Sequence, residues 1–389
     1  SIRRQRQMCI RDRLTIAKES LPSNPLLGVG PNQFAVSWAA FRPQGILGTN
    51  IWNVNFTSGN SIFFTSLVTM GILGFLAWLL FIASIFYTAT RKIFVKSDDI
   101  TIRHLRVIAG MLTMYLLLAV IVFTPGLVIQ VLLWVSAGIL VAQTLSATDN
   151  KFWTFSFMNS PKKNFVSMLV VVLVLLGSIV FAFVRTEQFL GRVTLVHASQ
   201  SFSREEPRGK VESLLSRSTN FAKRDDTYTS MSLFYTALLK QELNMFEKND
   251  SLPDDEKTLI KNLWTNAESY ALLAVNSEPK RVENWLFLSK FYFDSTAMGI
   301  TGSLSNTEKA LKGALVLSPS DPAILVSLAV IAYQSSDITA GNDYVVQALT
   351  LDPTFKDAIT LQNQIKTIQS SASSTTTENL EDEVTSASE

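Results

Sequence analysis

The sequence predicts an all-α protein, with membrane-spanning helices in its first half and helical repeats in its second. Three observations lead to this prediction. Hydrophobic residues make up 47% of the 389 residues and charged residues only 17%, below the roughly 25% usual for soluble domains. The long apolar runs end at Val184. Beyond that residue, alanine and proline recur at a fixed spacing.

Four stretches are predicted to cross the membrane within a module at 62–185, namely residues 62–87, 107–124, 127–145 and 164–184. The first is an apolar run of 26 residues, which as a helix would be about 39 Å long, enough for a bilayer core. Pro125-Gly126 marks a turn between the second and third stretches. The fourth is rich in valine and leucine, and lipid still forces it to be helical.

The orientation of these spans follows from lysine and arginine. The link between the first and second spans and the link between the third and fourth are basic, whereas the Pro125-Gly126 turn carries no charge. The basic residues of the two links are Arg91, Lys92, Lys96, Arg103, Arg106, Lys151, Lys162 and Lys163. The positive-inside rule places both links in the cytoplasm. We therefore expect a multi-pass protein of the plasma membrane, with the loop at 14–61 and everything after Val184 outside the cytoplasm.

The predicted repeats occupy residues 228–369, after linker helices at 186–227. Ala274, Ala314 and Ala348 each lie five residues before a proline, and Pro319 and Pro353 are 34 residues apart, the period of tetratricopeptide repeats. Trp285, Leu288 and Tyr292 approach the aromatic pattern of that repeat. Small alanines would let paired helices approach closely, and each proline would end a helix. The alternative is a set of helical hairpins without true repeats.

The two ends of the chain differ from the rest. Residues 1–13, SIRRQRQMCIRDR, resemble a translated sequencing adapter, although a basic cytoplasmic loop remains the alternative. On either interpretation we expect the chain to be the C-terminal part of a longer protein. The acidic, Ser/Thr-rich tail at 370–389 is expected to be disordered.

Composition argues against several classes of site. The chain has one cysteine, Cys9, so it cannot form an internal disulfide or a cysteine zinc cluster. Its two histidines, His104 and His197, are far apart in sequence, and we expect no metal site and no cofactor. The net charge of +2 gives no indication of nucleic-acid binding.

Two segments resemble the O-antigen ligase and polymerase family. NPLLGVGPNQF at 24–34 is similar to the family signature P-x-x-G-x-G-P-x-x-F, and SGNSIFFTSLVTMGILGFLAWLLF at 58–81 is similar to its junction between external loop and membrane span. The resemblance covers about residues 14–184. It implies transfer of a glycan from a polyprenyl-pyrophosphate carrier to an acceptor at the outer face of the membrane, without an obligatory metal.

The resemblance also implies site residues. Asn60 matches the junction asparagine, but Gly59 stands where the family has a histidine, the candidate base. Arg42 is a candidate catalytic residue beside Asn60, because a guanidinium suits a pyrophosphate. Arg13, within the suspected adapter, and Trp52 are candidates for substrate binding. The loop is expected to be shaped by Gly28, Gly30 and Pro31.

Two rival functions remain open. One is a membrane-anchored scaffold without catalysis, in which the repeats bind a partner of cell-envelope assembly. The other is a protein O-oligosaccharyltransferase, whose repeats would recruit an acceptor protein. The expected partners are accordingly the lipid-linked glycan, membrane lipid and a protein or glycan acceptor held by the repeats.

Overall fold

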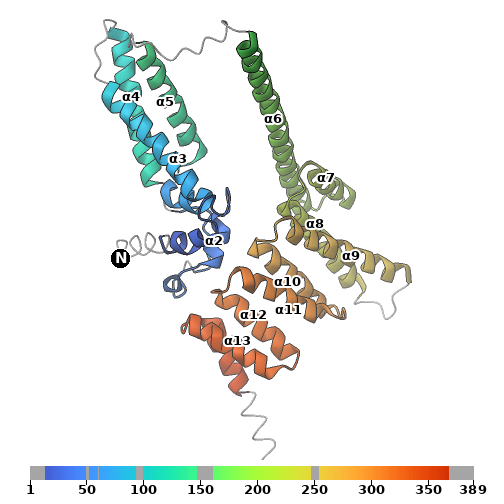
Figure 1. Cartoon of the computed structure of the whole chain (residues 1–389). Helices are drawn as coiled ribbons and strands as arrows, with labels where there is room; N and C mark the ends of the chain where they lie inside the picture. Colours follow the sequence, from blue (N-terminus) through green and yellow to red (C-terminus); the bar gives the residue numbers. More distant parts are fainter. Residues whose placement is uncertain are drawn as a thin grey trace, which may run out of the picture. The chain divides into compact units, whose positions relative to one another are not determined.

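A computed structural model describes residues 14–49, 52–59, 61–92, 100–123, 125–146, 161–246 and 254–367. These residues form helices and connecting turns, without a β-strand (Figure 1). The chain divides into two compact units, one made of Ser1–Lys151 and Leu315–Glu389 and the other of Phe152–Ala314. The predictions for residues 1–13, Asn60 and the tail at 370–389 lie outside the described residues.

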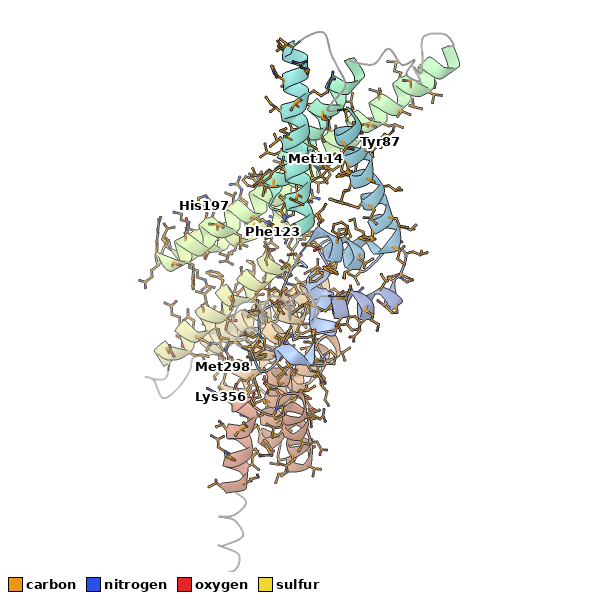
Figure 2. The ribbon with its side chains drawn as sticks, turned by 90° about the vertical axis from the view of Figure 1, so that its left-hand side faces the viewer. Tyr87, Met114, Phe123, His197, Met298 and Lys356 are labelled. Carbon is orange, nitrogen blue, oxygen red and sulfur yellow. The ribbon has the colours of Figure 1, made fainter. Side chains whose placement is uncertain are left out.

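The first unit contains a bundle of three apolar helices, drawn with its side chains in Figure 2, where Tyr87 and Met114 mark two of them. The helices are α3 (Ile62–Lys92), α4 (Ile100–Val122) and α5 (Leu127–Ser146). Their contact includes Ile85, Leu116, Leu117, Val120 and Leu133, all less than 8% exposed. The bundle buries one side of each helix and leaves large apolar side chains exposed on the other.

Three helical segments of the described chain are long and apolar enough to cross a membrane, namely Ile62–Thr88, Arg103–Val122 and Phe165–Ser203. These cover the first predicted span and most of the second and fourth. The third prediction falls in α5, whose described apolar segment Leu127–Ala142 is shorter. Helix α4 ends before Pro125-Gly126 and helix α5 begins after it, so the turn lies where the sequence predicts it.

The first apolar helix is not continuous. Gly71 has φ 66° and ψ −167°, so α3 is broken there into two helical halves. The expectation of one regular helix over 62–87 is therefore wrong at this residue. Glycine has no Cβ and therefore adopts a positive φ at little cost. The helix is kinked at Gly71.

The second unit begins with α6 (Pro161–Ser203), a 43-residue helix that continues from the fourth apolar stretch through the predicted linker. Helix α7 (Arg208–Phe221) packs against it. The two helices approach closely at Gly191, whose carbonyl accepts a 2.7 Å hydrogen bond from the Ser218 hydroxyl. A Cβ on Gly191 would lie 2.8 Å from the Ala222 Cβ.

The helices of the repeat region are α8 (Asp225–Phe246), α9 (Asp254–Ser277), α10 (Val282–Ala297), α11 (Ser303–Leu317), α12 (Pro322–Gln334), α13 (Ile338–Leu351) and a last helix at 356–367. Among them, α8 packs against α9 and α12 packs against α13. Ala274, Ala314 and Ala348 are each 0% exposed. This confirms the prediction that the recurring alanines lie at close contacts. The chain thus contains a tetratricopeptide-like repeat region.

Candidate functional site

The loop that precedes α3 is joined to the break in α3 through its backbone. In an unbroken helix the carbonyls of Val68 and Thr69 would accept from the amides of Ile72 and Leu73. Here the loop supplies replacement partners for all four groups. The bonds are Val29 N–H to Val68 O (3.0 Å), Gly30 N–H to Thr69 O (3.0 Å), Ile72 N–H to Pro25 O (2.9 Å) and Leu73 N–H to Leu26 O (3.2 Å). We call this arrangement of residues 25–30 and 68–73 the clasp.

Glycine is required on both sides of the clasp. Gly28 has φ 68°, and a Cβ there would lie 2.5 Å from Val68 O. A Cβ on Gly71 would lie 2.5 Å from both Gly28 N and Leu26 O. The two glycines therefore let two backbones meet. Gly30 has φ 111° and lies in the next turn of the loop, immediately before Pro31.

The clasp rests on a small core that the loop forms with α3. The core contains Ile16, Phe34, Trp38, Ile46 and Val68, each no more than 5% exposed. Trp38, on the short helix α2 (Phe34–Ala40), meets Phe56 edge to face at 4.6 Å between ring centroids. The aromatic residues of the loop thus include a buried set that fixes the loop on α3.

The junction before α3 has little room at the position of the family's histidine. The Gly59 amide donates to Thr65 Oγ1 at 2.9 Å, which fixes the turn into the helix. A Cβ on Gly59 would lie 3.1 Å from Phe64 Cβ and from Thr65 N. A larger residue there would have to displace these neighbours by a few tenths of an ångström. Glycine therefore matches the local geometry of this chain, and Asn60 lies outside the described residues.

Arg42 joins the loop to the repeats. It is 5% exposed, and its Nη1 lies 3.2 Å from Asp321 Oδ2, while Nη2 donates to Asn55 Oδ1 at 3.4 Å. Asp321 is also the N-cap of α12, where its other oxygen accepts from the Ala323 amide. Within the described part of the chain, Arg42 Nε has no hydrogen-bond partner. Arg42 is thus held in a buried ion pair on the first unit.

Three more contacts accompany this ion pair. The Ser318 hydroxyl donates to Ala39 O at 3.2 Å. Trp52 meets Phe355 edge to face at 5.3 Å between ring centroids. A Cβ built on Gly48 would lie 3.9 Å from Thr354 Oγ1. The four repeat residues Ser318, Asp321, Thr354 and Phe355 form what we call the repeat seat, and the loop lies on it.

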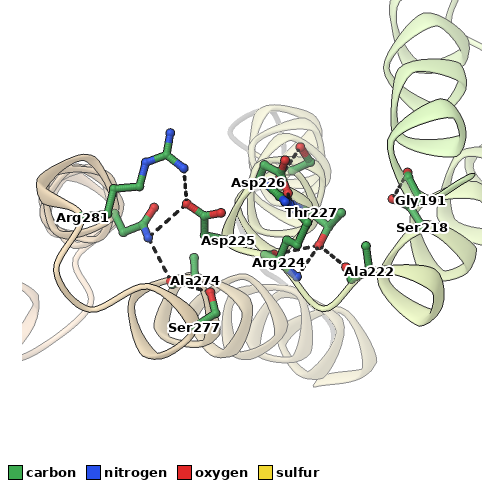
Figure 3. A network of polar contacts seen from close by, with 12 residues as sticks. Gly191, Ser218, Ala222, Arg224, Asp225, Asp226, Thr227, Ala274, Ser277 and Arg281 are labelled. Atoms are coloured by element: carbon green, nitrogen blue, oxygen red, sulfur yellow. Dashed lines mark hydrogen bonds and ion pairs between the residues drawn. The ribbon is translucent and has the colours of Figure 1, made fainter. Parts of the chain in front are cut away.

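The second unit contains a related pair between repeats (Figure 3). Asp225, 3% exposed at the start of α8, accepts from Arg281 Nη1 at 2.6 Å and from Asn284 Nδ2 at 3.4 Å. Asn284 also donates to Ala274 O, the buried alanine before the next helix. The start of one repeat helix is in this way tied to the start of the following repeat.

Two tyrosine–carboxylate pairs join neighbouring helices of the same unit. The Tyr235 hydroxyl donates to Glu212 Oε1 at 2.9 Å, and the Tyr292 hydroxyl donates to Glu268 Oε1 at 2.8 Å. Burial raises the pKa of both tyrosines above the ordinary value, and the adjacent carboxylate raises it further. Both side chains therefore remain protonated donors at neutral pH.

The predicted site residues have different outcomes. Arg42 and Trp52 are both in the described loop, and both contact the repeats rather than an open pocket. Arg13 and Asn60 are not among the described residues. His104 and His197 are exposed on α4 and α6, the latter labelled in Figure 2. No cluster of three metal-binding side chains occurs among the described residues.

Sequence reasoning missed Asp321 and Phe355, the partners of Arg42 and Trp52. Both lie two residues after a repeat proline, as does Arg281. That shared position in the repeat was the available signal. Arg42 and Asp321 are 279 residues apart in sequence. No local sequence pattern could therefore identify Asp321 as the partner of Arg42.

No protein-family model matches the chain, and no curated protein matches it either. Among solved structures the chain is similar to YrrB, described as a TPR protein with an unusual peptide-binding site, at 13% identity and a TM-score of 0.25, over 44% of this chain and 90% of that one. It is also similar to PilF of Pseudomonas aeruginosa, at 10% identity and a TM-score of 0.20, over 46% of this chain and 99% of that one. Both scores are far below 0.5, so the tetratricopeptide-like description rests on the chain's own helix pairs and buried alanines.

Proposed function

We propose that the complete protein is a membrane glycan transferase of the O-antigen ligase or polymerase type. It would move a glycan from a polyprenyl-pyrophosphate carrier to an acceptor at the outer face of the plasma membrane. The observation that carries this proposal is the clasp. The glycine signature and the junction segment were matched to the family separately, and four backbone hydrogen bonds join them in this chain.

The contacts of the loop support an extracytoplasmic place for the repeats. Arg42 and Asp321 can form their ion pair only if loop and repeats lie on one side of the membrane. The four predicted spans, an even number with α5 counted as the third, would bring the chain back to that side. The basic links between the spans favour the cytoplasm, so the loop and repeats belong outside, where a lipid-linked glycan is used.

The chemistry assigns different tasks to the candidate residues. Arg42 is already paired with Asp321, so it positions the loop, and the pyrophosphate would be held by other basic groups, with Arg13 the candidate from the sequence. Asn60 would hold the acceptor hydroxyl, since an amide can bind a hydroxyl but cannot take its proton. Trp52 has its ring against Phe355 and would meet substrate only with its remaining surface.

A membrane-anchored scaffold is the second candidate. One observation favours it, because two of the residues expected to bind substrate are engaged by the repeats instead. In that case the protein would hold a partner of envelope assembly, and an isolated preparation would transfer nothing. A protein O-oligosaccharyltransferase differs from the main proposal in its acceptor, which would be a protein.

The test uses the product of the complete gene, purified in detergent and incubated with lipid-linked glycan extracted from the source cells. We expect glycan to move to an acceptor in wild-type protein. Gly71→Ala should lower the rate on the order of a hundredfold or more, because a Cβ displaces the clasp and misplaces the loop. Gly138→Ala is the matched control, since a Cβ there meets nothing within 4 Å.

Transfer by the wild type and by Gly138→Ala, with loss in Gly71→Ala, supports the proposal. Absence of transfer from wild-type protein that is folded and supplied with carrier and acceptor would favour the scaffold. A Gly71→Ala protein as active as wild type would show that glycan transfer does not depend on the clasp. A glycan found on a protein acceptor would identify the oligosaccharyltransferase.

A further inference from the structure

The position two residues after the repeat proline has a common use in this chain. It holds Arg281, Asp321 and Phe355 in three successive repeats. Arg281 pairs with the acidic residue of a neighbouring repeat helix. Asp321 and Phe355 instead contact Arg42 and Trp52 of the loop. In the last two repeats, the residue at this position thus contacts the loop. In the repeat before them, the residue at the same position contacts another repeat helix.

We propose that the repeat seat positions the transferase loop, with Asp321 and Phe355 as positioning residues for the reaction. This inference rests on the proposed function for its catalytic consequence, although the seat itself can be tested without transfer. The repeats would then do more than recruit a partner. They would hold the loop in the conformation that closes the clasp on α3.

A continuous set of contacts leads from the seat to the clasp. Ser318 binds the carbonyl of Ala39 at the end of α2. The preceding residue, Trp38, is 1% exposed and packs in one core with Val68. The carbonyl of Val68 accepts the first hydrogen bond of the clasp, from Val29. Displacement of the loop on the seat therefore shifts the residues that fill the break in α3.

The chemistry of the seat makes one orientation of the loop favourable. The Arg42–Asp321 pair has side chains 3% and 13% exposed, so water screens it little. Breaking one partner of such a buried pair leaves an uncompensated charge. The edge-to-face contact of Trp52 with Phe355 fixes a second point of the loop. With the hydrogen bond from Ser318 to Ala39 O, three points of contact determine both the place and the rotation of the loop.

The first arm of the test is a cross-link that needs no activity. In Cys9→Ser protein, Gly48→Cys and Thr354→Cys should form a disulfide on mild oxidation, because the Gly48 Cβ position is 3.9 Å from Thr354 Oγ1. Gly48→Cys with Ser335→Cys is the control. Asp321 of the seat is the N-cap of the 13-residue α12 and Ser335 is its C-cap, about 20 Å away along the helix axis. A disulfide in the first pair and none in the control supports the seat. Equal cross-linking, or none in the first pair, would overturn it.

The second arm separates positioning from folding. Asp321→Asn keeps an N-cap acceptor for Ala323 and removes the charge that holds Arg42. We expect turnover to fall on the order of tenfold, with little change in KM for the carrier, since the loop is misplaced. Asp337→Asn, the same change at the N-cap of α13, is the matched control and should leave turnover unchanged.

The cross-link should also rescue the variant. Oxidised Gly48→Cys/Thr354→Cys in the Asp321→Asn background should recover most of the lost turnover, and reduction should abolish the recovery. Unchanged turnover in Asp321→Asn, or a loss that the disulfide does not repair, would overturn the positioning role. If wild-type protein transfers no glycan but the disulfide forms, the proposed function fails and the seat remains.

Discussion

Asp225 and Asp321 both lie at the beginning of a repeat helix and are bound by an arginine, but the arginine comes from different parts of the chain. Asp225 is bound by Arg281, from the following repeat. Asp321 is bound by Arg42, from the loop before the apolar helix α3. The difference shows that one kind of contact can join repeat to repeat or join the repeats to the loop. The end of this repeat region is therefore an attachment surface for the loop.

The arginines of the two pairs also differ in exposure. The Arg281 side chain is 50% exposed, whereas that of Arg42 is 3% exposed. Water can solvate Arg281 when its partner is removed, and it can do so for Arg42 only if the loop moves. Loss of the first pair should affect the stability of the repeats, and loss of the second should affect the position of the loop.

The largest effect is expected from Asp225→Ala. The change removes two hydrogen bonds to a buried carboxylate and should lower the free energy of unfolding of the repeats by about 2–3 kcal/mol. Thermal unfolding of the protein in detergent, followed by circular dichroism, measures the effect. Asp226→Ala, at the neighbouring and more exposed carboxylate, is the control. An unchanged melting temperature in Asp225→Ala would contradict the claim that the Asp225–Arg281 pair stabilises the repeats.

Arg42→Ala should have a smaller effect on unfolding and a selective effect on the loop. It removes the ion pair of the seat, worth on the order of 1–3 kcal/mol, while Asp321 still caps α12. We expect the loop at 14–59 to become sensitive to protease while the repeats stay resistant. Arg281→Ala should show the opposite pattern. Equal protection of the loop in both variants would contradict the distinction between the two pairs.

The sequence was sufficient for the elements and not for their connection. Apolar length located the long apolar helices, and the spacing of alanine and proline located the buried helix contacts at Ala274, Ala314 and Ala348. The break at Gly71 was missed because an apolar run with glycines reads as one span. Its cause is a set of backbone hydrogen bonds from a loop about 40 residues earlier, which no side-chain periodicity records.

Alkaline pH should give the smallest effect and affect the repeats more than the seat. Tyr235 and Tyr292 have pKa values raised above the ordinary 10.0. Above pH 10 the unfolded tyrosines lose protons that the folded ones keep, so the stability they contribute falls as pH rises. The four residues of the seat include no tyrosine. Tyr235→Phe/Tyr292→Phe protein should therefore show a shallower loss of melting temperature above pH 10 than wild type, and identical slopes would refute this.

The most direct test of the central claim is the side of the membrane on which the repeats lie. The Arg42–Asp321 pair requires the repeats to lie on the same side of the membrane as the loop, and the proposed topology makes that side the outer one. Val316, 80% exposed near the end of α11, can be changed to cysteine in Cys9→Ser protein. The account predicts labelling of Val316→Cys by a membrane-impermeant maleimide in spheroplasts with an intact plasma membrane. Labelling only after lysis would place the repeats in the cytoplasm and contradict both the topology and the proposed function.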